Sequence, residues 1–313
     1  MIEIDPLDDS VLERRDLFRG AGTVAAWLAA ANQGVAQAEP AGRVPEAQAG
    51  PPLPTVPFGK HKLTRLIAGA NTIYGYSHFN YVFSTTMGEY HTTPRVLSFL
   101  EELERAGVNT WQASWSERLE IDWLKYKEKG GKLQLLLLSR PNFNEQPEMV
   151  KRAMKLQPLG IAQHGGSTNR LWHSGQFEKS RDYLKHIRDA GAMVGLSCHN
   201  PKAVEYAEEK GWDVDFYQCC FYQHRKSGPW REEERERMTA MIRKASKPCI
   251  GFKVLAGNRH TKKAEDVRAA LEYAFRRMKP TDVVLVGMWQ KHKDQVGENA
   301  DLVRKILEPS DRT

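Results

Sequence analysis

The sequence predicts a (β/α)₈ barrel, or TIM barrel, because a short apolar segment alternates eight times with an amphipathic helical one between Leu63 and Pro309. The alternating stretch is close in length to the roughly 250 residues of a typical barrel of this kind. The apolar segments have the character of parallel strands that are buried on both faces. A doubly wound open sheet is the alternative, but no glycine-rich fingerprint follows the first strand.

Each predicted strand is a mostly apolar run that ends where helical spacing of apolar residues begins. In chain order the strands are expected at Leu66–Ala70, Val108–Ala113, Leu133–Arg140, Leu159–His164, Met193–His199, Val214–Tyr222, Cys249–Ala256 and Asp282–Met288. Helices are expected between them, including Pro94–Ala106, Glu178–Ala190 and Ala264–Met278. The barrel domain is therefore assigned to residues 58–309, and a short tail to residues 310–313.

The first 38 residues resemble a twin-arginine (Tat) export signal. Arg14 and Arg15 precede an Ala-rich apolar run, Gly20–Val35, and Ala36-Gln37-Ala38 supplies the small residues that a signal peptidase needs. Glu13 stands where Ser or Thr usually precedes the Arg pair. The resemblance implies the Tat translocase as a partner during export and a periplasmic or secreted location. Because this route carries folded proteins, it also suits a protein that acquires a cofactor in the cytoplasm.

Between the signal and the barrel, residues 39–57 contain six Pro and no periodicity, which predicts a flexible linker. The net charge is +7, but basic residues alternate with acidic ones along the predicted helices. Since nucleic-acid binding requires clustered basic residues, we expect no nucleic-acid partner. All four Cys fall in predicted strands, so they are interpreted as small buried residues rather than a disulfide framework.

Polar side chains stand at the predicted carboxyl ends of the strands, where barrels of this class place their active sites. They are Asn71, Gln112, Ser114, Ser139, Arg140, Gln163, His164, Ser197, His199, Gln218, Tyr222 and Lys253. Burying such groups is costly unless they are paired or bind something. The sequence therefore predicts a site for a small-molecule substrate at this end of the barrel.

Two kinds of loop extend this predicted site. The first loop, Asn71–Thr93, is long and rich in Tyr and Phe, which suits a cover over a substrate. The loops after strands seven and eight carry Asn258-Arg259-His260 and Lys291-His292-Lys293, at the usual phosphate site of the fold. A phosphorylated ligand is favoured there, although ordinary basic helix starts would have the same composition.

Five motifs occur in an order that resembles the aldo/keto reductases over residues 54–309. They are Phe58-Gly59 before the first strand, Gly107–Trp111, Val194–Ser197, Phe252–Gly257, and Val286–Met288 followed by Glu298-Asn299. The family moves a hydride from NADPH to a carbonyl and uses an Asp, Tyr, Lys and His tetrad. At the matching positions this chain has Gln112, Glu117, Arg140 and His164, so only the His is retained. These four are the candidate catalytic residues.

The positions that hold the cofactor in the family are better preserved. The resemblance implies that Ser197 and Gln218 contact the nicotinamide amide and that Phe221 stacks on its ring. It places Glu298 and Asn299 at the adenine, and we add Lys253 to the cofactor-binding set. Cys198 and Gln295 replace the Asn and the Arg that the family has at these points.

Three functions remain open from the sequence. One is an NADP-dependent oxidoreductase with an altered site, in which His164 orients a small carbonyl or sugar-type substrate, Arg140 stabilises negative charge and Glu117 serves as acid or base. Another is a metal-dependent sugar lyase, isomerase or hydrolase, with a divalent metal held by Glu117, His164 and His199. The third is a periplasmic binding protein that has lost catalysis.

Overall fold

A computed structural model describes residues 51–140, 146–223 and 230–308 of the chain. The predicted Tat signal at residues 1–38, most of the predicted linker and the tail at residues 310–313 lie outside the described residues. No described helix has the length and apolar character that crossing a membrane would need.

Eight parallel strands close into a barrel in the order β10-β3-β4-β5-β6-β7-β8-β9. The strands are β3 (Leu66–Gly69), β4 (Thr110–Ser114), β5 (Gln134–Leu138), β6 (Gly160–Gln163), β7 (Met193–Cys198), β8 (Phe216–Cys220), β9 (Cys249–Phe252) and β10 (Val283–Gly287). Each falls within or overlaps a strand that the sequence predicts. The (β/α)₈ barrel is confirmed.

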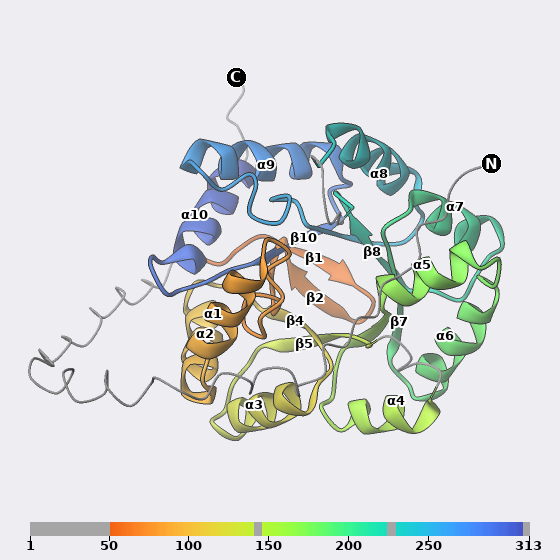
Figure 1. Ribbon diagram of the computed structural model, residues 1–313, viewed down its shortest axis with the longest axis horizontal. Coiled ribbons are helices and arrows are strands. Elements are labelled where there is room, and N and C mark those ends of the chain that lie inside the picture. The colour runs from red at the N-terminus through yellow and green to blue at the C-terminus, as the bar shows by residue number, and fades with distance from the viewer. Residues whose placement is uncertain (1–50, 141–145, 224–229, 309–313) are drawn as a thin grey trace, which may run out of the picture. The chain divides into compact units, whose positions relative to one another are not determined.

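Helices surround the barrel, as Figure 1 shows. They are α1 (Tyr81–Tyr90), α2 (Thr93–Arg105), α3 (Glu117–Glu128), α4 (Pro147–Met154), α5 (Gly165–His173), α6 (Lys179–Asp189), α7 (Pro201–Glu209), α8 (Glu232–Lys244), α9 (Ala264–Arg277) and α10 (Gln295–Leu307). The predicted helices match α2, α6 and α9 within one or two residues. Helix α1 lies inside the segment that was predicted only as a long aromatic loop.

A β-hairpin, β1 (Thr55–Phe58) and β2 (His61–Thr64), closes the amino-terminal end of the barrel. The side chains of Phe58 and Leu63 are fully buried and belong to the apolar cluster that fills the barrel interior. The Phe58 and Phe216 rings lie 5.0 Å apart. The hairpin begins inside the predicted linker, so the barrel unit starts earlier than the predicted boundary at residue 58. The hairpin side chains therefore fill this end of the barrel.

Side chains along each strand alternate between the barrel interior and the helices, as the period of a strand requires. On β8, for example, Phe216 packs inside the barrel, whereas Tyr217 and Cys219 belong to the larger core between strands and helices. All four cysteines are buried free thiols, as the sequence predicts. This alternation decides which predicted site residues face the mouth of the barrel.

Candidate functional site

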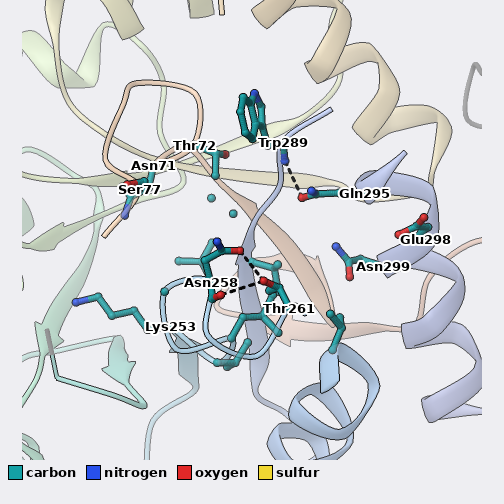
Figure 2. Close-up of a pocket in the computed structure, with 18 of the residues that line it drawn as sticks. Asn71, Thr72, Ser77, Lys253, Asn258, Thr261, Trp289, Gln295, Glu298 and Asn299 are labelled. Carbon is teal, nitrogen blue, oxygen red and sulfur yellow. Dashed lines mark hydrogen bonds between the residues drawn. The ribbon is translucent and has the colours of Figure 1, made fainter. Parts of the chain in front are cut away.

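A cavity of about 660 Å³ opens at the carboxyl end of the barrel and runs toward helix α10. Its lining comes from β3, β4, β9 and β10, from the loops after them, and from α9 and α10. Figure 2 shows the loop with Asn258 and Thr261 on one side of this space and Thr72 and Trp289 on the other. A volume of this size is within the range of small-molecule and cofactor sites.

The mouth of the barrel forms one end of the cavity. Gln112 on β4 and Phe252 on β9 line it, and Lys253 follows directly after β9. Lys253 has a left-handed backbone with φ of 57°. Such a conformation is uncommon for a residue other than glycine, and strained positions of this kind gather at functional sites. In Figure 2 the Lys253 side chain points away from Asn258 and Asn299.

The other end of the cavity lies against α10. Glu298 and Asn299 line it, as does Gln295, whose side-chain oxygen accepts a 2.9 Å hydrogen bond from the backbone N–H of Trp289. Glu298 pairs with Lys293 at 2.5 Å. Three residues of the predicted cofactor-binding set therefore line the same cavity: Glu298 and Asn299, which the resemblance assigns to the adenine, and Lys253.

The basic loop after β9 is only partly directed at this space. Asn258 and Thr261 line the cavity, and the Thr261 hydroxyl donates to the Asn258 side-chain oxygen at 2.5 Å. Arg259 lies over the Trp230 ring at 4.5 Å, and His260 contacts Tyr222 at 3.3 Å. Part of the predicted phosphate-binding charge is thus used to hold the loop itself.

Two histidines stand at neighbouring strand ends beside the mouth. His164 caps α5, and its Nδ1 accepts a 2.9 Å hydrogen bond from the N–H of Gly166. His199 follows β7, and its Nδ1 lies 3.2 Å from the amide nitrogen of Asn169 on α5. The His199 ring is 5.8 Å from that of Phe252. Helix α5, which was not predicted, therefore fixes the orientation of both imidazoles.

Burial lowers the pKa of His164 to about 4, and the charge of Lys253 acts in the same direction. Burial also lowers the pKa of His199 to about 3, and the charges of Lys253, His164 and His78 lower it by smaller amounts. Desolvation and a nearby positive charge both disfavour the protonated ring. At neutral pH both side chains are therefore neutral imidazoles beside a charged lysine.

Ser197 and Gln218 occupy paired positions of β7 and β8 and are not among the residues that line the cavity. Both are about 2% exposed. Gln218 alternates with Tyr217 and Cys219, which face the helices, so its side chain belongs to the barrel interior. The amide nitrogen of Gln218 is buried and makes no hydrogen bond. An orphaned donor of this kind costs about 1–3 kcal/mol and calls for an explanation.

Three predicted site residues lie elsewhere. Glu117 is the first residue of α3, and its side chain is 79% exposed with Arg152 of α4 at 4.0 Å. Arg140 is exposed, and the cavity lining does not include it. Phe221 is fully buried in the core between strands and helices, so it cannot stack on a ligand ring. The predictions that Glu117 meets His164 at the mouth and that Phe221 faces the cofactor are wrong, whereas the catalytic role of Arg140 stays a prediction.

Other lining residues were not singled out as site residues from the sequence. They include Phe252, Thr72 and Trp289. Thr72 donates a 2.6 Å hydrogen bond to the Met288 carbonyl oxygen, which joins the first loop to the end of β10. Strand alternation was the available signal for Phe252, because it places this ring inside the barrel two residues after Ile250.

Solved structures with the same fold resemble this chain at low sequence identity. The apo form of Gox0644 is 11% identical over 84% of this chain and 97% of that chain, with a TM-score of 0.54. A mutant of Gox0644 in complex with NADPH is 12% identical over 80% and 88%, with a TM-score of 0.54. Orotidine 5′-monophosphate decarboxylase from Methanocaldococcus jannaschii is 17% identical over 79% and 99%, with a TM-score of 0.48.

No protein-family model matches the chain. No curated protein matches its sequence. At these identities the similar structures establish the barrel fold alone, which is the fold of many unrelated enzymes.

Proposed function

We propose that the protein binds NADP(H) along the cavity and transfers a hydride between it and a small carbonyl compound at the barrel mouth, as an aldo/keto-reductase-like oxidoreductase. The carrying observation is the course of the cavity, which joins Gln112 and Phe252 at the mouth to Glu298 and Asn299 on α10. A cavity of this volume that is lined from the barrel mouth to α10 has room for a dinucleotide. A solved structure with the same fold holds NADPH, which is consistent with this assignment.

The residues at the mouth fit a nicotinamide. The unpartnered amide nitrogen of Gln218 is a donor for the carboxamide oxygen, and Ser197 stands beside Gln218 in the register of β7 and β8. Phe252 supplies an aromatic face in the lining, in place of Phe221. When bound, the cofactor would supply or accept the hydride.

The opposite end fits an adenosine with an additional phosphate. Asn299 is nearly buried and offers both a donor and an acceptor to an adenine. Arg268 of α9 and Lys305 of α10 line the same end, and neither has an ion-pair partner in the described part of the chain. Exposed cations there favour NADP(H) over NAD(H), because a 2′-phosphate would pair with them.

The chemistry at the mouth uses Lys253 and His164. With Nδ1 of His164 accepting from Gly166, the proton of the neutral ring is on Nε2, which can donate to the substrate carbonyl oxygen and polarise it. With the bound cofactor supplying the hydride, the charged amine of Lys253 would give a proton to the substrate oxygen as negative charge develops there. In this scheme Lys253 takes the acid role that was predicted for Glu117.

The metal-dependent alternative has lost the ligand set that the sequence offered. Glu117 lies on the outside of the barrel, away from His164 and His199. Within the described ranges no group of at least three His, Cys, Asp or Glu side chains could hold a metal ion. A binding protein without catalysis remains the second candidate, and NADPH consumption with carbonyl compounds distinguishes it.

Export through the Tat translocase remains part of the proposal.

Substitution of Gln218, whose amide nitrogen has no partner, tests the proposed nicotinamide site. In Gln218→Leu, the affinity for NADPH should fall about tenfold, since one neutral hydrogen bond is lost, while the free energy of unfolding should stay equal or rise by about 1 kcal/mol. Isothermal titration calorimetry and urea unfolding measure the two quantities. The matched control is Gln163→Leu, because the Gln163 amide is bonded to Thr168 and Ser180. That control should lose stability and keep its NADPH affinity; an unchanged affinity in Gln218→Leu would contradict the nicotinamide site.

A further inference from the structure

Hydrogen-bond donors without a counter-charge gather at the barrel mouth. The charge of Lys253 lowers the pKa of both His164 and His199, and the charges of His164 and His78 also lower the pKa of His199. In the described part of the chain no carboxylate is among the charges that act on these two rings. The acidic residues of the cavity lining, Glu265, Glu298 and Asp301, all come from α9 and α10. One half-buried lysine beside two neutral imidazoles, with no carboxylate acting on the two rings, suits an anionic ligand.

The imidazole of His164 is fixed as a donor. Nδ1 of His164 accepts from the N–H of Gly166, so its neutral ring carries the proton on Nε2. The ring of His199 is held by the Asn169 amide nitrogen, 3.2 Å from its Nδ1, and by a backbone hydrogen bond to Gly165, which raises its pKa against the larger effect of burial. The position of His199 depends on Gly165, because a Cβ there would lie only 2.6 Å from Cε1 of His199. Glycine therefore lets the start of α5 approach the ring closely.

We propose that the substrate is a 2-oxo acid, with its carboxylate and its oxo group both held by Lys253 and with His164 donating to the same anion. This inference rests on the proposed NADP(H)-dependent function and names the substrate class of that site.

The geometry of the charged amine explains why a 2-oxo acid fits better than a simple aldehyde. The amine has three N–H donors, so it can bridge the oxo oxygen and the adjacent carboxylate oxygen. The same group then neutralises the carboxylate and protonates the oxo oxygen as the hydride adds to carbon. The product is a 2-hydroxy acid, and the nicotinamide is oxidised as the oxo group is reduced.

The space below the mouth also limits the size of the acid. Phe216 fills the barrel interior so closely that a Cβ on Gly195 would lie 2.3 Å from it. The hairpin side chain of Phe58 packs against the same ring. A substrate must therefore be short on the side that points into the barrel, and any larger substituent must extend toward the loop that contains α1.

The test measures binding of a carboxylate that cannot be reduced. Protein saturated with NADPH is titrated calorimetrically with oxamate, and in parallel with its neutral ester, methyl oxamate. We expect oxamate to bind at least about tenfold more tightly than the ester, because hydrogen bonds to a charged group are the stronger ones. Equal affinity for the two compounds would overturn the assignment of a 2-oxo acid.

Two substitutions test which side chains bind the carboxylate of the substrate. Lys253→Met should weaken oxamate binding by about 10- to 100-fold while the NADPH affinity changes little. The control, Lys262→Met, removes the same charge from an exposed residue of the same loop and should change neither affinity. His164→Leu should weaken oxamate binding, and His164→Gln should restore much of it, because the Gln amide returns a donor near Nε2. A purely structural role for His164 would not give this rescue.

The outcomes separate the two proposals. If Lys253→Met weakens NADPH as strongly as oxamate, Lys253 holds the cofactor and the substrate inference is wrong. If NADPH binds but oxamate does not, the substrate class is wrong and the dinucleotide site stands. If NADPH itself does not bind to the unaltered protein, the proposed function falls, and the substrate inference falls with it.

Discussion

The two mouth histidines carry information that the residue type alone does not give. A histidine at a strand end is compatible with an acid, a base, a metal ligand or a buried structural group. Here the cap of α5 and the amide of Asn169 occupy Nδ1 of His164 and of His199. His164 is consequently a donor of fixed direction, and the low pKa values of both rings keep them neutral throughout the physiological range.

These pKa values predict how stability changes with pH. In the unfolded chain a histidine takes up a proton near pH 6.5, whereas folded His164 does so only near pH 4. The unfolded state therefore binds more protons between these values, and stability falls as the pH drops through this window. Each such histidine contributes a slope of about 1.4 kcal/mol per pH unit. Above pH 6.5 the contribution is constant.

Urea unfolding of His164→Gln between pH 7 and pH 4 measures this effect. The variant should lose less stability on acidification than the unaltered protein, because one titrating group has been removed. His173→Gln is the matched control on the same helix, since His173 is exposed. If both variants follow the profile of the unaltered protein, His164 is not a buried neutral ring.

At the scale of elements, the strands were predictable and the short helices near the site were not. Each strand is a short, mostly apolar run, as expected for a strand that is buried on both faces. Helix α5 begins with Gly165-Gly166, which reads as a loop. Helix α1 contains Ser84, Thr85 and Thr86 and buries only Met87, so its apolar period is weak. The local sequence of each helix therefore does not predict it, and contacts with other parts of the fold stabilise it.

The β1–β2 hairpin makes the barrel a closed container at its amino-terminal end. Phe58→Ala should lower the free energy of unfolding by about 3–5 kcal/mol, because it removes a fully buried ring and leaves a cavity. The NADPH affinity should change little, since the hairpin lies at the opposite end from the cavity. Chemical denaturation and calorimetry measure the two effects. Lys60→Ala, in the exposed hairpin turn, is the control; a loss of stability of the same size there would contradict the packing account.

At the scale of the whole molecule, the errors in the predicted site have a common physical cause. The resemblance transferred residues by their distance along the chain, whereas the barrel sorts side chains by strand alternation. Gln218 faces the interior, so Phe221, three positions later, lies in the outer core. Glu117 had already entered α3, where the side chain turns outward to Arg152.

The closed barrel also explains which residues could be predicted to share a site. Gln112 and Lys253 come from distant parts of the chain, and parallel strands of one barrel bring their carboxyl ends together, while the helix after the last strand, α10, adds Glu298 and Asn299 to the same cavity. The sequence predicted that these residues would share one site. It could not predict the contribution of the α5 cap or the unpartnered amide of Gln218, because both depend on side-chain contacts across strands.

The most direct test of the account is a crystal structure of the protein grown with NADPH. The account predicts one nucleotide per barrel, with the carboxamide at Gln218 and Ser197, the ring over Phe252 and the adenine beside Asn299. A nucleotide bound in the opposite direction, bound on another face, or absent at saturating concentration would contradict it.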